Sequence, residues 1–464
     1  MTREDTNGNT TVLAIRQGSL RGRTDGGVTA FRGIPYAAPP VGRLRFRPPA
    51  AHPGWPGVRD ATEAGPSVPQ GPGRLAPVMG ERTADWDEDG CLNLNVWTPA
   101  GAVGTGGAIG TGGAFRPAAG DRPRPVLLWF HGGGFASGSG GWDWYDGARL
   151  AAAGDLVVVT ANYRIGPLGY LHLPEAGADN LGVRDQAAAL HWVRDTIGAF
   201  GGDPDRITVG GQSAGAYSAL ALALDPATGP LVHRVVLQSG PWNLLPQAPE
   251  DATRAADRFL ALLGIERDEH LAKSLRDVPA ADLLDAYGRV AAELARPGDG
   301  APPMYPVLGG FGYPAAWPTA LAAGALAGKG VLVGSTTHEA TAFLGPDAPA
   351  DLVAAVTRAA FGEGVDTLAR ECAAHGAPAH VYRFARASTA VPGLGAPHCA
   401  ELPFAFDRLD AYATAPMLGP VDAQDRELAR SFSGALAAFA ATGDPGWPAH
   451  RPGVEPYVRV IGGN

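Results

Sequence analysis

The amino-acid sequence predicts an α/β protein whose mainly parallel central sheet is covered by helices on both faces. Residues 126–130 and 156–161 are continuous apolar runs, as strands buried on both faces require. Apolar residues recur with the 3.6-residue period of a helix between Val183 and Phe200. Strand-like and helix-like segments alternate through the rest of the chain, an arrangement typical of parallel sheets.

In chain order, a strand-rich start leads into this alternation. Strands are predicted at 11–15, 28–31, 92–97, 126–130, 156–161, 207–210, 235–238, 331–334 and 381–384. Helices are predicted at 183–200, 214–224, 251–263, 280–295 and 423–441, the last ended by Gly443 and Pro445. Residues 101–125 form a Gly/Ala/Pro tract without periodicity. We interpret the tract as a surface loop within one domain that spans residues 1–464.

Composition excludes several classes of function. The chain has 464 residues, of which 45% are hydrophobic and 18% charged, which is typical of a globular protein with a large core. The net charge of −9 and the absence of a basic cluster predict no nucleic-acid partner. The sequence has no apolar run long enough to predict a membrane span, and its start lacks the apolar segment of a signal peptide, so we do not expect secretion.

The cysteines point to a reducing compartment. There are only 3 of them, at positions 91, 372 and 399, and they lack metal-ligand spacing. We therefore expect no disulfide framework, no metal and a cytoplasmic protein. We also expect a monomer or a weak homo-oligomer.

A serine motif lies between a predicted strand and a predicted helix. Gly211, Ser213 and Gly215 form a Gly-x-Ser-x-Gly pattern directly after the strand at 207–210. Such a tight turn exposes the serine hydroxyl and places the N–H of Ala214 at a helix N-terminus, where negative charge is favoured. The pattern alone also occurs by chance, so its position between strand and helix carries the prediction of a nucleophile.

A glycine-rich loop follows the strand at 126–130. Its sequence is His131-Gly132-Gly133-Gly134-Phe135. Glycines let the backbone approach a substrate carbonyl and aim N–H groups at its oxygen, so Gly133 and Gly134, with Ala214, are the candidate oxyanion hole. A plain glycine turn is the alternative, but it does not explain the position of the loop after a buried strand and before the serine motif.

Together these motifs resemble the type B carboxylesterases, the cholinesterase/carboxylesterase group of the α/β-hydrolase fold, and indicate a bacterial-type member. Further matching segments are 31–37, 88–96, 162–164, 180–186, 200–204 and 442–445. The resemblance implies helical elaborations over the active site, a small-molecule ester as substrate and no cofactor.

The resemblance also assigns the partners of the nucleophile. It implies that Glu339 is the catalytic acid and His398 the base, in the Ser–acid–His order of this fold. Without it, Glu339 would be interpreted as a solvated loop carboxylate and His398 as a surface or capping histidine. The resemblance further implies that Ser239 supports the catalytic acid without being part of the triad.

The sequence departs from the family pattern at several positions. Gln212 replaces the glutamate that usually precedes the nucleophile, which makes affinity for cationic choline esters doubtful. Cys91 occupies a disulfide position of the family, but its partner position is Val68. Glu339 and His398 are only 59 positions apart, a shorter interval than in the family, so we expect a wider active-site cleft than in longer family members.

One further match concerns architecture. Arg43 and Glu88 occupy positions that form a buried ion pair in the family.

The function predicted from these residues is hydrolysis of carboxylic esters through an acyl-enzyme. An amidase, carbamate hydrolase or lactone hydrolase would use the same machinery. A non-catalytic, cholinesterase-like binding scaffold is the alternative from another class, although such relatives lose residues of the triad.

Overall fold

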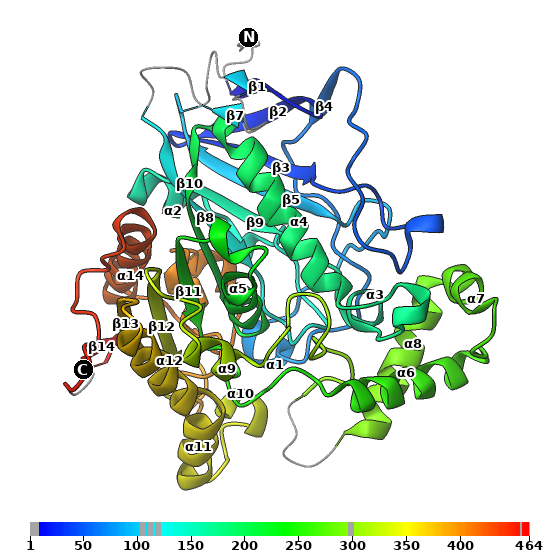
Figure 1. Ribbon diagram of the computed structural model, residues 1–464. Helices are drawn as coiled ribbons and strands as arrows, with labels where there is room; N and C mark the ends of the chain where they lie inside the picture. Colours follow the sequence, from blue (N-terminus) through cyan, green and yellow to red (C-terminus); the bar gives the residue numbers. More distant parts are fainter. Residues whose placement is uncertain are drawn as a thin grey trace.

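The centre of the protein is one large, twisted sheet (Figure 1). The computed structural model describes residues 9–102, 108–109, 115–116, 122–295, 301–454 and 457–463. The sheet has 12 strands in the order β1-β2-β3-β5-β9-β8-β10-β11-β12-β13-β14, with β4 paired to β2. The strands are β1 (Thr10–Ile15), β2 (Gly18–Asp25), β3 (Val28–Pro35), β4 (Val58–Asp60), β5 (Asn93–Pro99), β8 (Arg124–Phe130), β9 (Val157–Ala161), β10 (Gly202–Gln212), β11 (Arg234–Gln238), β12 (Gly330–Thr336), β13 (Ala379–Phe384) and β14 (Val458–Ile461).

The direction of pairing changes across the sheet. The N-terminal strands β1, β2, β3 and β5 pair antiparallel, as does β5 with β9. From β9 through β8 to β14 every pair is parallel. The prediction of a mainly parallel sheet is confirmed, and the carboxyl ends of seven neighbouring strands, β9, β8, β10, β11, β12, β13 and β14, meet at one edge.

Both faces of the parallel part are buried, which explains its continuous apolar runs. Along β8, Val126 and Leu128 belong to one core, and Leu127 and Trp129 belong to the other. This alternation follows the two-residue period of a strand. Helices α4 (Leu181–Thr196) and α5 (Ala214–Leu224) pack on the first face, whereas α14 (Ala423–Thr442) packs on the second.

The remaining helices surround this frame. They are α1 (Ala76–Met79), α2 (Ala148–Gly154), α3 (Gly166–Tyr170), α6 (Pro249–Leu263), α7 (Leu271–Asp277), α8 (Ala280–Leu294), α9 (Trp317–Ala322), α10 (Thr341–Leu344), α11 (Ala350–Thr357), α12 (Glu363–Ala374) and α13 (Leu402–Ala405). Helices α6, α7 and α8 lie together beside the sheet, on the right of Figure 1. Among the described residues, no helix combines the length and the apolar character needed to cross a bilayer.

All predicted strands and helices are present, and the structure adds elements that the sequence pattern did not reveal. Strand β2 was missed because arginines and glycines interrupt its apolar pattern, and β14 because it is a short edge strand. Most of the predicted loop at 101–125 lies outside the described residues. Within it, β6 (Ala108–Ile109) and β7 (Phe115–Arg116) pair antiparallel.

Two further expectations concern single side chains. The predicted ion pair between Arg43 and Glu88 is wrong, because Arg45 makes it instead, with 2.5 and 2.9 Å between its guanidinium nitrogens and the two carboxylate oxygens. Arg43 lies within a 3₁₀ turn (Gly42–Leu44) that leaves its side chain exposed. Cys91 is buried and free, as expected from the valine at position 68.

Candidate active site

The serine motif forms a sharp turn between β10 and α5. Ser213 has φ 57° and ψ −124°, a conformation that L-residues rarely adopt and that is found at functional sites. A Cβ atom on Gly215 would lie 2.0 Å from the carbonyl oxygen of Phe130, and one on Gly211 would lie 2.3 Å from the carbonyl carbon of Gly215. Only glycine therefore fits on either side of Ser213, which explains the spacing of the motif.

Three predicted residues are joined by hydrogen bonds. The hydroxyl of Ser213 lies 2.8 Å from Nε2 of His398, and Nδ1 of His398 lies 2.5 Å from Oε2 of Glu339. The other carboxylate oxygen of Glu339 accepts the N–H of Thr336 at 2.7 Å. Because a carboxylate only accepts, Nδ1 carries the proton and Nε2 is free to accept one from the serine. Glu339 and His398 are 0% and 1% exposed.

Two aromatic rings, not identified from the sequence, flank the imidazole of His398. The Phe343 ring from α10 lies 5.3 Å from it, and the Phe361 ring lies 5.1 Å from it, measured between centroids. Phe361 belongs to a short π-helix (Arg358–Gly362) between α11 and α12, a distortion that is frequent at functional sites. Phe343 is 48% exposed, so its ring is also accessible from outside.

The glycine loop presents N–H groups beside the serine. Gly133 has φ 113° and Gly134 φ 61°, values that favour glycine. Within the described part of the chain, the N–H groups of Gly133, Gly134 and Ala214 donate to no protein acceptor. Ala214 is the first residue of α5, where free N–H groups and the helix dipole attract negative charge. This arrangement can stabilise an oxyanion.

His131 holds the base of the glycine loop. Its Nδ1 lies 2.8 Å from the carbonyl oxygen of Gly132, and its ring stacks on Tyr163 at 4.5 Å between centroids. Burial lowers the pKa of His131 to about 4, so the ring is neutral at neutral pH. The hydroxyl of Tyr163 donates to the His131 carbonyl at 2.8 Å. These contacts give His131 a structural role in the loop.

The two predicted supporting residues lie close to the triad, but one has a different partner. The Gln212 amide nitrogen lies 3.2 Å from Nε2 of His398. Ser239 was expected to support Glu339, but its hydroxyl donates to Glu401. The physical reason lies in the available acceptors: both oxygens of Glu339 already have partners, Thr336 and His398, whereas Oε1 of Glu401 accepts the serine hydroxyl. Glu401 lies three residues after His398, and sequence reasoning gave it no role.

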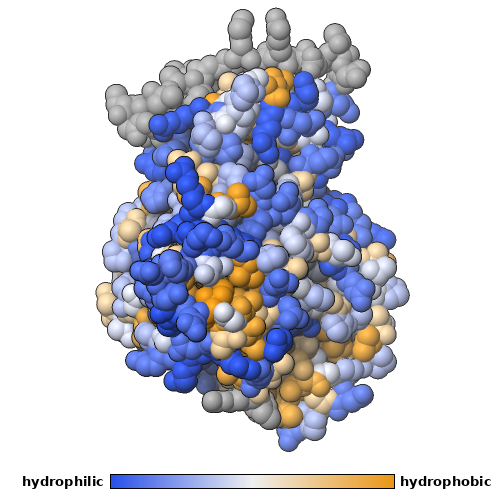
Figure 2. All heavy atoms as spheres, turned by 90° about the vertical axis from the view of Figure 1, so that its right-hand side faces the viewer, coloured by the Kyte–Doolittle hydropathy of each residue, from blue (hydrophilic) through white to orange (hydrophobic). Residues whose placement is uncertain are grey.

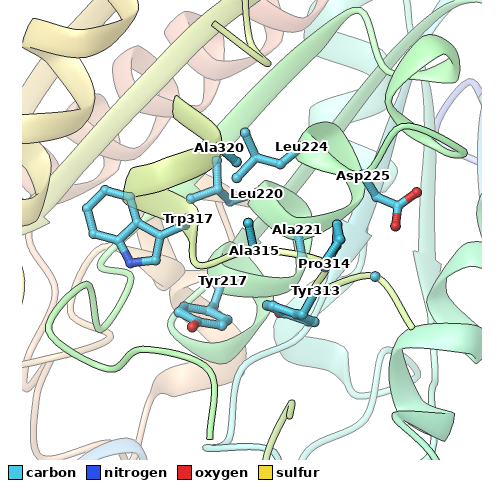
Figure 3. A pocket seen from close by; sticks show the side chains of 11 residues that line it. Tyr217, Leu220, Ala221, Leu224, Asp225, Tyr313, Pro314, Ala315, Trp317 and Ala320 are labelled. Atoms are coloured by element: carbon cyan, nitrogen blue, oxygen red, sulfur yellow. The ribbon is translucent and has the colours of Figure 1, made fainter. Parts of the chain in front are cut away.

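Two hollows in the described part of the protein lie away from this site. A cavity of about 20 Å³, room for about one water molecule, lies between α5, α9 and residues 312–315 (Figure 3). A groove of about 550 Å³ lies between α6, α7 and α8. On that side of the molecule, Figure 2 shows hydrophobic patches among hydrophilic atoms. Neither hollow is lined by Ser213, His398 or Glu339.

Comparisons with known proteins agree with one another. The sequence profile of the carboxylesterase family matches residues 9–351. A probable N-octanoylanthranilate hydrolase of Rhodococcus erythropolis is 36% identical, with 94% of each chain covered. Phenmedipham hydrolase of Pseudarthrobacter oxydans is 34% identical, covering 96% of this chain and 94% of its own. Para-nitrobenzyl esterase of Bacillus subtilis is 34% identical, covering 95% and 92%. The solved structure of a thermophilic PNB esterase superposes with a TM-score of 0.83 at 32% identity, covering 97% and 95%.

Proposed function

The chain belongs to the carboxylesterase family, and on this premise we propose that Ser213, His398 and Glu339 hydrolyse carboxylic esters through an acyl-enzyme. Family membership makes the protein a carboxylic-ester hydrolase of the α/β-hydrolase fold. The roles of individual residues are our proposal. The continuous chain of hydrogen bonds from Ser213 through His398 to Glu339 is the observation that carries it.

In the first half of the reaction, the serine oxygen attacks the ester carbonyl carbon. A free serine hydroxyl is a weak nucleophile, so Nε2 of His398 takes its proton during attack. Glu339 stabilises the imidazolium that forms. The former carbonyl oxygen becomes negatively charged and accepts hydrogen bonds from the N–H groups of Gly133, Gly134 and Ala214. The imidazolium then gives its proton to the departing alcohol.

In the second half, water replaces the alcohol. His398 accepts a proton from the water as its oxygen attacks the acyl carbon, and the same N–H groups hold the second oxyanion. Collapse of this intermediate returns the proton to Ser213 and releases the carboxylic acid. No other group is required for the proton transfers of either half.

Labelling with a fluorophosphonate probe tests the assignment of the nucleophile. The folded protein is expected to be labelled on Ser213, and Ser213→Ala is expected to lose both labelling and several orders of magnitude in kcat. If the folded wild-type protein were not labelled, the non-catalytic scaffold would be the better description.

We propose neutral esters with aromatic or bulky groups as substrates, rather than choline esters. Gln212 places a neutral amide beside His398, and the exposed Phe343 ring offers an aromatic surface next to the reacting atoms. The names of two relatives contain aromatic groups, nitrobenzyl and anthranilate. The short interval between Glu339 and His398 supports a wide cleft that tolerates bulk.

A panel of esters tests this substrate class. The kcat/KM for para-nitrobenzyl acetate is expected to exceed that for ethyl acetate, and Phe343→Ala is expected to reduce the difference. Leu352→Ala is the matched control, because Leu352 is similarly exposed, at 45%. Equal effects of the two substitutions would contradict a specific role of Phe343. Anilides and aryl carbamates in the same panel distinguish ester hydrolysis from the amidase and carbamate alternatives.

We also propose a cytoplasmic protein that is a monomer or a weak homo-oligomer. The three free cysteine thiols support a reducing compartment. Cell fractionation tests the location, and sedimentation tests the oligomeric state.

A further inference from the structure

Glu401 is a second buried carboxyl group beside the catalytic acid. It is 0% exposed, and its Oε1 accepts the hydroxyl of Ser239. Its Oε2 is also buried and has no hydrogen-bond partner within the described residues. An ionised carboxylate with an unpartnered buried oxygen is costly, whereas the protonated form is much less so. The mechanism above does not use this group.

The neighbours of Glu401 act on it in opposite directions. Burial raises its pKa to about 7, and the charge of Glu339 adds to the rise. The hydrogen bond from Ser239 and the charge of protonated His398 lower that pKa. The other titratable groups that face it are Cys399, Tyr382 and Tyr145, and burial raises the pKa of each. These three stay neutral, so Glu339 and His398 supply the charges that Glu401 senses.

We infer that Glu401 is a positioning residue of the hydrolase and that it exists in a protonated and an ionised form. The ionised form stabilises protonated His398. The inference rests on the proposed triad. The step is a simple acid dissociation: the carboxyl O–H bond breaks, its electron pair stays on Glu401 and the proton goes to solvent. The charge then acts on His398 across the buried site without touching the substrate.

The stabilisation follows from reciprocity. If the positive charge of His398 favours ionised Glu401, then ionised Glu401 favours the positive charge of His398 by the same free energy. That charge develops when Nε2 takes the proton of Ser213. The enzyme with ionised Glu401 is therefore expected to be faster than the enzyme with neutral Glu401 when His398 starts neutral.

The pH dependence of kcat/KM in Glu401→Gln tests the inference. Glutamine mimics the protonated carboxyl and can still accept from Ser239. The ratio of wild-type to variant kcat/KM is expected to be about 1 at pH 5.5 and to rise roughly 3- to 10-fold by pH 9. A ratio that is constant across pH would overturn the inference.

Two further variants sharpen the kinetic test. Ser239→Ala removes a hydrogen bond that favours ionised Glu401, so the pH dependence of its rate is expected to move toward higher pH. Glu88→Gln is the matched control, because burial also raises the pKa of Glu88 but Glu88 pairs with Arg45. Its ratio to wild type is expected to be flat. A rise in the Glu88→Gln ratio equal to that in Glu401→Gln would contradict the inference.

Infrared spectroscopy separates this inference from the proposed triad. In the inactive Ser213→Ala protein, the C=O stretch of a buried carboxylic acid is expected at pH 5.5, weakened by pH 9 and absent after adding Glu401→Gln. No such band at pH 5.5 would overturn the role of Glu401 and leave the triad intact. Full activity of Ser213→Ala would overturn the triad instead.

Discussion

The triad is flanked by the glycine loop on one side, the oxyanion side, and by a second buried carboxyl group on the other, the acid side. Each side holds a buried titratable side chain, and burial keeps both side chains neutral between about pH 4 and pH 7. On the oxyanion side, the pKa of His131 is lowered to about 4. On the acid side, the pKa of Glu401 is raised to about 7. Loss of hydration is the first cause in both cases, and it shifts a base and an acid in opposite directions.

Their surroundings distinguish the two groups. Apart from burial, only the carbonyl of Gly132 shifts the pKa of His131. Glu401 lies near the charges of Glu339 and His398, so it titrates close to neutral pH and responds to the reaction. A buried titratable group is therefore structural when its neighbours are neutral. It becomes part of the electrostatics of catalysis when its neighbours carry charge.

Displacing the N–H groups of the glycine loop, on the oxyanion side, is expected to have the largest effect on the rate. In Gly133→Ala, the new Cβ would lie 2.0 Å from the Ser137 carbonyl oxygen, and φ is 113°. The loop must move its N–H groups, so kcat/KM for a para-nitrophenyl ester is expected to fall about 100- to 1000-fold. Gly434→Ala is the control, since a Cβ there meets nothing within 4 Å. An unchanged rate in Gly133→Ala would contradict the role of the loop.

Acid is expected to destabilise the oxyanion side. The unfolded chain protonates His131 near its ordinary pKa of 6.5, whereas the folded protein does so only near 4. The free energy of unfolding therefore falls as pH decreases from 6.5 to 4, by up to about 3 kcal/mol. His131→Asn is expected to flatten this slope in urea titrations. His270→Asn, at an exposed site, is expected to leave the slope unchanged. Parallel curves for wild type and His131→Asn would contradict the assignment.

The acid side is expected to show the opposite and smaller dependence. Because the folded-state pKa of Glu401 lies above its ordinary value, the folded protein retains a proton that the unfolded chain releases. This contribution to the free energy of unfolding decreases as pH rises from about 4.5 through 7. Glu401→Gln is therefore expected to gain stability relative to wild type between pH 5 and pH 8.5. A constant difference across this range in urea titrations would count against the buried proton.

Adding a negative charge beside His398 is expected to have the smallest effect, a change in the preference for a cationic substrate. Gln212→Glu places a carboxylate beside His398, where it would attract a cationic leaving group by roughly 1 kcal/mol. The preference for butyrylcholine over its neutral isostere of equal size is expected to rise about 5-fold. The wild-type enzyme is expected to prefer the cation by less than 10-fold. A larger wild-type preference would indicate a cationic site built from other side chains.

Periodicity and local motifs were sufficient to predict the central sheet and to propose Ser213 as the nucleophile. Strands buried on both faces must be apolar throughout, so β8 and β9 were visible as runs. Gly211, Gly215 and Gly133 are required because a Cβ atom at each position would lie 2.0 to 2.3 Å from backbone atoms, and this requirement made both motifs visible in the sequence. Glu339 and His398 have no such local signal. They were identified by resemblance alone, because their partners are distant in the sequence.

Contacts between side chains that are distant in the sequence became visible only in the folded protein. Arg45, two positions after the predicted Arg43, makes the ion pair with Glu88, and the hydroxyl of Ser239 donates to Glu401 rather than to Glu339. The π-helix that brings Phe361 onto His398 was equally invisible in the sequence. Periodicity and motifs report which residues are buried and where the chain turns. The direction of a side chain at a turn depends on one or two dihedral angles and on neighbours from other strands, and only the folded chain brings these together.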